Sequence, residues 1–158
     1  PPTIQRPTTQ FVPYLNLDGN CAEAMAFYAK LFGGQIVFQS TFGEMPPDAG
    51  MPPLPESVKN RLMHAQLQVG AQSLMASDAM PAMPGMDPET CGGGYRRPQG
   101  LWVSIGVETE AEGKRVFDGL AEGGQVTMPF GKTFWSPGFG MVTDRFGTPW
   151  MVNVAAQP

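Results

Sequence analysis

Apolar and polar positions alternate with two different periods along the chain, and the same succession of periods occurs twice. Segments with the two-residue period of strands lie at 11–17, 35–42, 61–69 and 72–77 in the first half, and at 101–107, 125–130, 139–143 and 150–154 in the second. A segment with the helical period follows the first strand of each half. The pattern therefore predicts the order β-α-β-β-β, written twice, in an α+β fold.

Both predicted helices carry start and stop signals. Asn20 is followed three residues later by Glu23, and Thr109 is followed three residues later by Glu112, which is the spacing of a capping box. Each helix ends at the first residue of a Gly-Gly pair, because the residue after a helix often adopts a positive φ. These signals predict helices that begin after Asn20 and Thr109.

The two halves also share a short sequence repeat. The tetrapeptide Gly-Gly-Gln-Ile at 33–36 recurs as Gly-Gly-Gln-Val at 123–126, an offset of 90 residues, and Phe27 falls on Phe117 at the same offset. Repetition of this kind indicates a duplicated structural unit. We expect one domain of two modules, module one at about 11–78 and module two at about 101–155, joined by a connector at 79–100.

Short turns are expected to close the last hairpin of each module. Residues 69–72 place Gly70 between two strands. At 144–147, Asp144 suits an Asx-type turn and Gly147 suits a positive φ.

Two long irregular segments, 43–57 and 79–100, interrupt the strands and are rich in methionine, proline and glycine. Segments of this length are usually functional lids or partly disordered linkers. Methionine is flexible and polarizable, so such loops can adapt to varied apolar ligands. The alternative is that they simply cover sheet edges, and the sequence leaves both open.

Composition and charge remove several classes of function. Apolar residues make up 42% of the chain, which allows a sizeable core, and the formal net charge is −4. Binding to nucleic acid or to an anionic membrane needs a basic face, so we expect neither partner. Two cysteines, Cys21 and Cys91, are too few for a disulfide framework, and neither shows a nucleophile motif. We expect a soluble cytoplasmic protein.

Short phrases spread over the chain resemble one protein family. They are Pro13-Tyr14-Leu15, Asp18-Gly19, Glu23-Ala24, Phe27-Tyr28, Phe32-Gly33-Gly34, Met63-His64-Ala65, Leu74-Met75, Ser77-Asp78, Met128-Pro129, Thr133-Phe134-Trp135, Asp144, Phe146-Gly147 and Trp150. Together they are similar to the PhnB-like group of the vicinal-oxygen-chelate superfamily, which includes glyoxalase I, extradiol dioxygenases and bleomycin-resistance proteins. The resemblance implies two β-α-β-β-β modules whose eight strands form a curled mixed sheet around a cleft, usually in a homodimer.

The resemblance also implies where a metal would be bound. Metal-dependent members place one His, Gln or Glu ligand on the first and last strand of each module. The corresponding places here fall near Val12 or Tyr14, near Met75, near Trp102 and near Met151. None of them is a His or a carboxylate, and thioether sulfur suits Cu(I) rather than the ions of this chemistry. We therefore expect no metal centre of this type and no cofactor.

His64, the only histidine in the chain, is the remaining candidate for proton chemistry. It could act as a general base or as a polar anchor in the cleft, with Asp78 orienting it. The alternative is a hydrogen-bonded structural histidine.

Aromatic and thioether side chains supply further candidates for ligand contact. Thr133 and Trp135 lie in a loop before the seventh strand, where the indole could stack on a ligand and the hydroxyl could orient it. The alternative is that the aromatics are core or dimer contacts. Trp150 and Met151 point to opposite faces of their strand, so a cleft-facing Met151 implies a structural Trp150.

Two functions from different classes remain. The first is a metal-free small-molecule binding protein with an apolar cleft, whose acidic balance would suit a cationic ligand. Its expected ligand-binding residues are Tyr14, His64, Met75, Trp102, Thr133, Trp135 and Met151. The alternative is a metal-dependent glyoxalase- or dioxygenase-type enzyme, and a dimeric scaffold without a ligand is a third option. A methyltransferase label, common in the family, has no support because no Gly-rich turn joins a strand to a helix.

Overall fold

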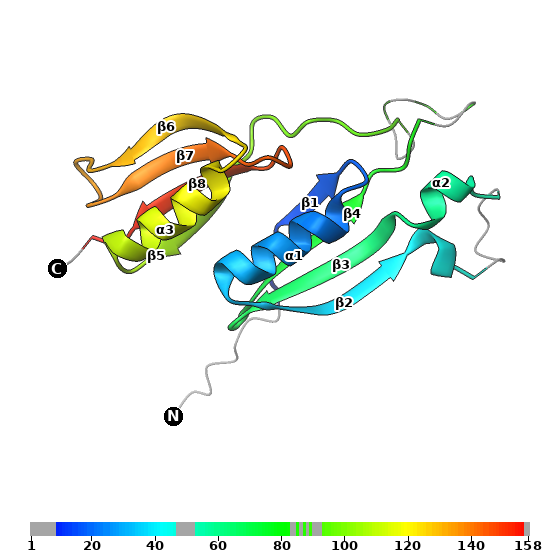
Figure 1. The fold of residues 1–158 in the computed structure, drawn as a ribbon, viewed down its shortest axis with the longest axis horizontal. Coiled ribbons are helices and arrows are strands. Elements are labelled where there is room, and N and C mark those ends of the chain that lie inside the picture. The colour runs from blue at the N-terminus through cyan, green and yellow to red at the C-terminus, as the bar shows by residue number, and fades with distance from the viewer. Residues whose placement is uncertain are drawn as a thin grey trace.

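Two four-stranded mixed sheets, each with a long helix against one face, form the fold of the described residues (Figure 1). The computed structural model describes residues 9–46, 53–82, 85, 87, 89 and 93–156. The expected order, β-α-β-β-β written twice, is confirmed. Cys91 and much of the methionine- and proline-rich segments lie outside the described residues.

Module one forms the first sheet. Its elements are β1 (Tyr14–Leu17), α1 (Cys21–Phe32), β2 (Gln35–Thr41), the 3-10 helix η1 (Phe42–Glu44), α2 (Glu56–Lys59), β3 (Leu62–Val69) and β4 (Gln72–Asp78). The strand order is β1-β4-β3-β2, in which β1 pairs with β4 in parallel and the other pairs are antiparallel. β1 starts at Tyr14 rather than at residue 11.

Module two repeats this arrangement. Its elements are β5 (Val103–Val107), α3 (Glu110–Ala121), β6 (Gln125–Gly131), β7 (Phe139–Thr143) and β8 (Pro149–Val154). The strand order β5-β8-β7-β6 and the parallel β5–β8 pair match those of module one. Duplication therefore extends from the sequence to the topology.

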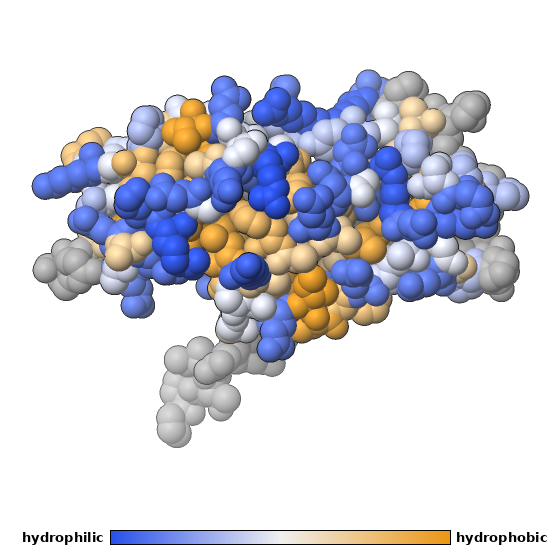
Figure 2. Space-filling view, in the orientation of Figure 1, coloured by the Kyte–Doolittle hydropathy of each residue, from blue (hydrophilic) through white to orange (hydrophobic). Residues whose placement is uncertain are grey.

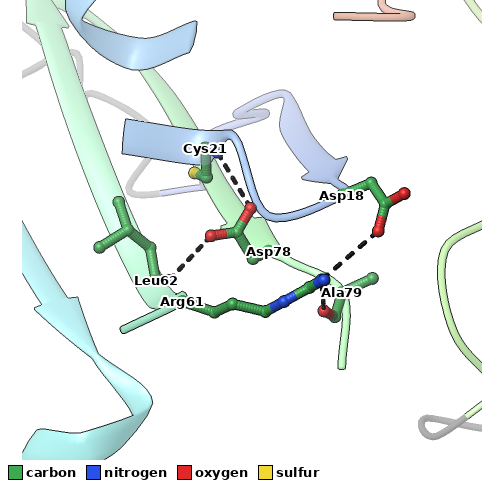
Figure 3. A network of polar contacts seen from close by, with 6 residues as sticks. All are labelled: Asp18, Cys21, Arg61, Leu62, Asp78 and Ala79. Atoms are coloured by element: carbon green, nitrogen blue, oxygen red, sulfur yellow. Dashed lines mark hydrogen bonds and ion pairs between the residues drawn. The ribbon is translucent and has the colours of Figure 1, made fainter. Parts of the chain in front are cut away.

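The two long helices begin at the expected residues but are capped differently. The Thr109 hydroxyl accepts a hydrogen bond from the Glu112 N–H at 3.2 Å, as the capping box predicts. Asn20 makes no such bond. Asp78 at the end of β4 instead accepts bonds from the N–H groups of Cys21 and Leu62, each at 2.9 Å (Figure 3).

Each sheet has one face against the helices and one face turned away from them. We call the second the open face. Side chains along a strand point alternately to the two faces of the sheet. Those on the helix side are buried: Leu15, Leu17, Ala65, Leu67, Leu74 and Ala76 in module one, and Val142, Trp150, Val152 and Val154 in module two. Trp150 is 1% exposed and contacts the ring of Tyr28 on α1, so the expected structural role of Trp150 is confirmed.

Asp144 connects the two modules through buried hydrogen bonds. Its carboxylate accepts from the hydroxyl of Tyr28 on α1 and from the indole N–H of Trp150, the latter at 2.8 Å. It also accepts from the N–H groups of Phe146 and Thr148, which confirms the expected Asx-type turn. Burial and the negative charge of Asp144 raise the pKa of the Tyr28 hydroxyl, which therefore stays protonated as the donor.

Among the described residues, no helix has both the length and the apolar character needed to cross a membrane.

Candidate functional site

One row of side chains runs across the open face of each sheet. In the first sheet, strand register places Tyr14, Met75, Gln66 and Phe38 side by side on β1, β4, β3 and β2. In the second, it places Ser104, Met151, Met141 and Met128 on β5, β8, β7 and β6. The 90-residue offset of the sequence repeat carries the first and last members of one row onto those of the other, so the rows are equivalent positions of the duplicated module.

Tyr14 and His64 meet on the open face of the first sheet. The Tyr14 hydroxyl and His64 Nδ1 are 3.0 Å apart, and the two rings stack with centroids 5.6 Å apart. The ring of Phe38 lies 5.7 Å from that of His64 on the other side. The phenol can hold the imidazole in a fixed orientation, a role that sequence reasoning assigned to an aspartate.

The expected contact between His64 and Asp78 is wrong. Ala65 pairs with Ala76, so Asp78 shares the helix-side face with Ala76 while His64 points to the open face. Asp78 is 4% exposed and accepts the two backbone bonds that cap α1 and anchor the start of β3 (Figure 3). Its role in the structure is to join these elements.

A pocket of about 530 Å³ lies between the neighbouring edges of the two sheets, β1 and β5. Tyr14 and Trp102, two of the expected ligand-binding residues, line it together with apolar side chains. Its polar lining residues are Asn16, Ser104, Thr148 and Arg96. Arg96 is paired with Glu89 at 3.3 Å, so this cation already has an exposed partner.

A second pocket, of about 700 Å³, opens on the side that faces the helices. Its lining includes Phe11, Phe32, Val116, Trp150 and the carboxylate-bearing Glu112. Apolar side chains gather near the middle of the molecule on the face seen in Figure 2, which is the helix side. This pocket adjoins the hydrophobic core at Trp150 and Val116, and it shares Pro13, Val103 and Ser104 with the pocket between β1 and β5.

The loop that holds Thr133 and Trp135 lies beside the second sheet. The Thr133 hydroxyl accepts from the Ser136 N–H at 3.1 Å and closes the loop on itself. Trp135 packs edge-on against Phe139, a residue of the open face, with ring centroids 5.2 Å apart. Phe134, which lies between Thr133 and Trp135 in the sequence motif, is 97% exposed. Neither Thr133 nor Trp135 lines the pocket between β1 and β5.

The resemblance implies ligand positions of metal-dependent members near Val12 or Tyr14, Met75, Trp102 and Met151, and strand register puts Tyr14, Met75, Ser104 and Met151 on the open faces there. A phenol, an alcohol and two thioethers do not form the nitrogen and oxygen donor set that Zn²⁺, Fe²⁺ or Mn²⁺ prefers. Nor do His, Cys, Asp and Glu side chains gather in threes anywhere among the described residues. The residues present therefore do not fit a divalent metal centre of that kind.

Two buried polar atoms on the open faces have no hydrogen-bond partner among the described residues. They are Ser40 Oγ, whose residue pairs with His64, and Asn153 Oδ1, whose residue pairs with Phe139. An unpaired buried acceptor costs about 1–3 kcal/mol unless a ligand or water satisfies it. Sequence reasoning missed both, because nothing local marks a Ser or Asn as unpartnered.

Two β-α-β-β-β modules with the same strand order define a duplicated α+β fold. The profile of the Glyoxalase/Bleomycin resistance protein/Dioxygenase superfamily matches residues 11–152, and the chain belongs to this superfamily. The expected family is thereby confirmed.

Three relatives are similar over nearly the whole chain. Protein YjdN of Escherichia coli strain K12 is 36% identical over 150 residues, covering 92% of this chain and 95% of the relative. The crystal structure of PA1353 from Pseudomonas aeruginosa is 43% identical with a TM-score of 0.78, covering 95% and 100%. The PhnB protein from Bacillus cereus is 26% identical with a TM-score of 0.69, covering 93% and 100%.

Proposed function

We propose that the chain is a small-molecule binding protein whose ligand enters the pocket between β1 and β5 without the help of a metal ion. The observation that carries this proposal is the pairing of Tyr14 and Trp102 on the walls of that pocket. Both residues are about half exposed. A bound ligand would remove this aromatic surface from water.

The chemistry of the lining favours a flat, largely apolar ligand. Pro13, Leu15, Leu101, Val103 and Pro149 supply apolar surface around the two aromatic rings. Aromatic stacking adds about 0.5–1.5 kcal/mol per ring pair beyond the burial of area. The few polar groups, Asn16, Ser104 and Thr148, are suited to orienting such a ligand.

His64 contacts Tyr14, one of the two aromatic residues of the pocket. Its Nδ1 bonds to Tyr14, while Nε2 makes no hydrogen bond with the described residues. Since the two rings stack, a ligand that moves the Tyr14 ring would also displace the His64 ring, and a change at His64 would displace Tyr14. In this proposal His64 is a polar anchor and a positioning residue for Tyr14.

The proposal includes a second copy of the chain as partner. β2 and β6 are the outer edges of the two sheets, and they expose Ile36, Val37 and Phe38, and Val126 and Met128. Exposed apolar edge strands are prone to pair with another chain. Sedimentation velocity should give a dimer, and Val37→Lys should shift it toward monomer; a monomeric parent protein would refute this part.

Binding of 8-anilinonaphthalene-1-sulfonate, a dye that fluoresces in apolar sites, tests the pocket. We expect saturable binding at one dye per chain, weakened about tenfold by Trp102→Ala, which corresponds to about 1.4 kcal/mol. Phe11→Ala is the matched control, because Phe11 is also an exposed aromatic residue but lines the other pocket.

Three results would overturn the proposal. They are the absence of saturable binding, a loss caused by Phe11→Ala instead of Trp102→Ala, and a loss on adding EDTA. The last would favour the alternative, a metal-dependent enzyme of the glyoxalase or dioxygenase type.

A further inference from the structure

Three methionines stand in one row on adjacent strands of the second sheet. Met128 on β6 pairs with Met141 on β7 between two register shifts of β6, and Met141 pairs with Met151 on β8 in regular register. Residues directly opposite on antiparallel strands project to the same face of the sheet. For Met141 and Met151 this is the open face, because their strand neighbours Val142 and Trp150 are buried on the helix side.

The spacing of the row allows the three sulfur atoms to converge. Directly opposite residues have Cβ atoms about 4.5–5.5 Å apart, so Met128 and Met151 flank Met141 at about 10 Å from each other. Each sulfur lies two bonds beyond its Cβ on a side chain with three rotatable bonds. The outer two thioethers can therefore lean inward over Met141 and share one ligand.

The duplicated module provides an internal comparison. The equivalent row of the first sheet holds Phe38, Gln66 and Met75, and so presents only one thioether. The fold therefore accepts a phenyl ring and an amide at the positions where the second sheet has Met128 and Met141. Three thioethers in register are a property of this sheet and not a requirement of the fold.

Thioether sulfur is a soft, uncharged donor that selects soft monovalent ions over Zn²⁺, Mg²⁺ or Ca²⁺. We propose that Met128, Met141 and Met151 form a binding site for Cu(I) or its chemical analogue Ag(I). The net charge of −4 favours the approach of a cation, and Asn153, two residues beyond Met151 on the same face, has a buried Oδ1 atom without a hydrogen-bond partner among the described residues. This site is additional to the proposed pocket between β1 and β5.

The absence of an ionisable donor gives the site a recognisable signature. Binding to cysteine or histidine releases a proton, so its strength changes with pH. A thioether carries no such proton. Affinity for Ag(I) at this row should therefore be the same at about pH 5.5 and about pH 7.5.

Titration with silver nitrate in chloride-free buffer, followed by calorimetry and native mass spectrometry, tests the proposal. The parent protein carries Cys91→Ser, so that this thiol does not compete for the metal. We expect one Ag(I) per chain, with an affinity that is lowered about tenfold or more by Met141→Leu and by Met128→Leu. Exchange of Met for Leu nearly conserves side-chain volume, so both variants should fold.

Met45→Leu is the matched control. Met45 follows the 3-10 helix η1, outside both sheets, and its replacement should leave Ag(I) binding unchanged. The proposal is overturned if the parent binds no Ag(I), if Met141→Leu and Met128→Leu bind as tightly as the parent, or if affinity falls at the lower pH. The dye experiment above tests only the pocket between β1 and β5, and the Ag(I) titration tests only the methionine row. Either proposal can therefore fail while the other holds.

Discussion

Replacing the Asp144 carboxylate by an amide should strongly destabilise the fold. Oδ1 accepts from the backbone N–H groups of Phe146 and Thr148, and Oδ2 accepts from the Tyr28 hydroxyl and the Trp150 indole. In Asp144→Asn, the remaining side-chain oxygen can still accept from the two backbone N–H groups. The NH₂ group that replaces Oδ2 is a donor and faces two other donors, the Tyr28 hydroxyl and the Trp150 indole N–H. Two hydrogen bonds to a charged acceptor are lost.

The size of the effect follows from these contacts. A hydrogen bond to a charged group contributes about 1.5–3 kcal/mol, so two lost bonds should cost about 3–6 kcal/mol. The residue is 4% exposed, which leaves little access for water to replace them. Asp118→Asn is the control, because Asp118 pairs with Lys114 on the surface and should cost less than about 1 kcal/mol.

Urea unfolding followed by circular dichroism gives the free energies. Tyr28→Phe should cost about 1.5–3 kcal/mol in the parent protein but much less in the Asp144→Asn background, because the bond it removes is already lost. Two results would contradict this expectation. One is a free energy of unfolding for Asp144→Asn within about 1 kcal/mol of that of the parent protein, and the other is an effect of the double substitution equal to the sum of the two single effects.

Three other predictions follow from local geometry. A Cβ at Gly124 would meet the backbone of β7, so Gly124→Ala should cost about 1–3 kcal/mol, whereas Gly106→Ala, with open space around its Cβ position, should cost clearly less on urea unfolding. Burial raises the pKa of the Cys21 thiol to about 12, so a Cys91→Ser protein should not react with Ellman's reagent near neutral pH until urea unfolds it; reaction of the native protein would contradict this. Burial and a neighbouring carboxylate raise the pKa of Tyr28 above its ordinary value of 10.0, so its contribution to stability is complete below pH 10 and is lost as pH rises further. Alkaline destabilisation should be reduced in Tyr28→Phe, and an unchanged pH profile in that variant would count against the assignment.

Features that depend on nearby residues could be read from the sequence. The Thr109 cap, the left-handed Gly33 and the Asx turn at Asp144 each form within a few residues, so their signals survive without knowledge of the tertiary structure. The duplicated topology could be predicted for a similar reason, since each module repeats the same succession of local patterns.

Contacts between distant segments could not be predicted in the same way. Asp78 caps a helix that begins 57 residues earlier in the chain, and no residue pattern near Asp78 indicates that its carboxylate caps a helix. The pairing of Tyr14 with His64 spans 50 residues and depends on the register of three strands. Strand register places Ser104 opposite Met151, and β5 begins at Val103, two residues later than its apolar pattern predicted.

Amide chemical-shift mapping by NMR can locate a ligand between β1 and β5 and show whether its binding needs a metal ion. The dye would be titrated into ¹⁵N-labelled protein in the presence of EDTA. We expect saturable shifts concentrated at Tyr14, Asn16, Trp102 and Thr148, which line only this pocket, with EDTA having no effect. Shifts confined to the lining of the other pocket around Phe11 and Val116, or binding that EDTA abolishes, would contradict this expectation.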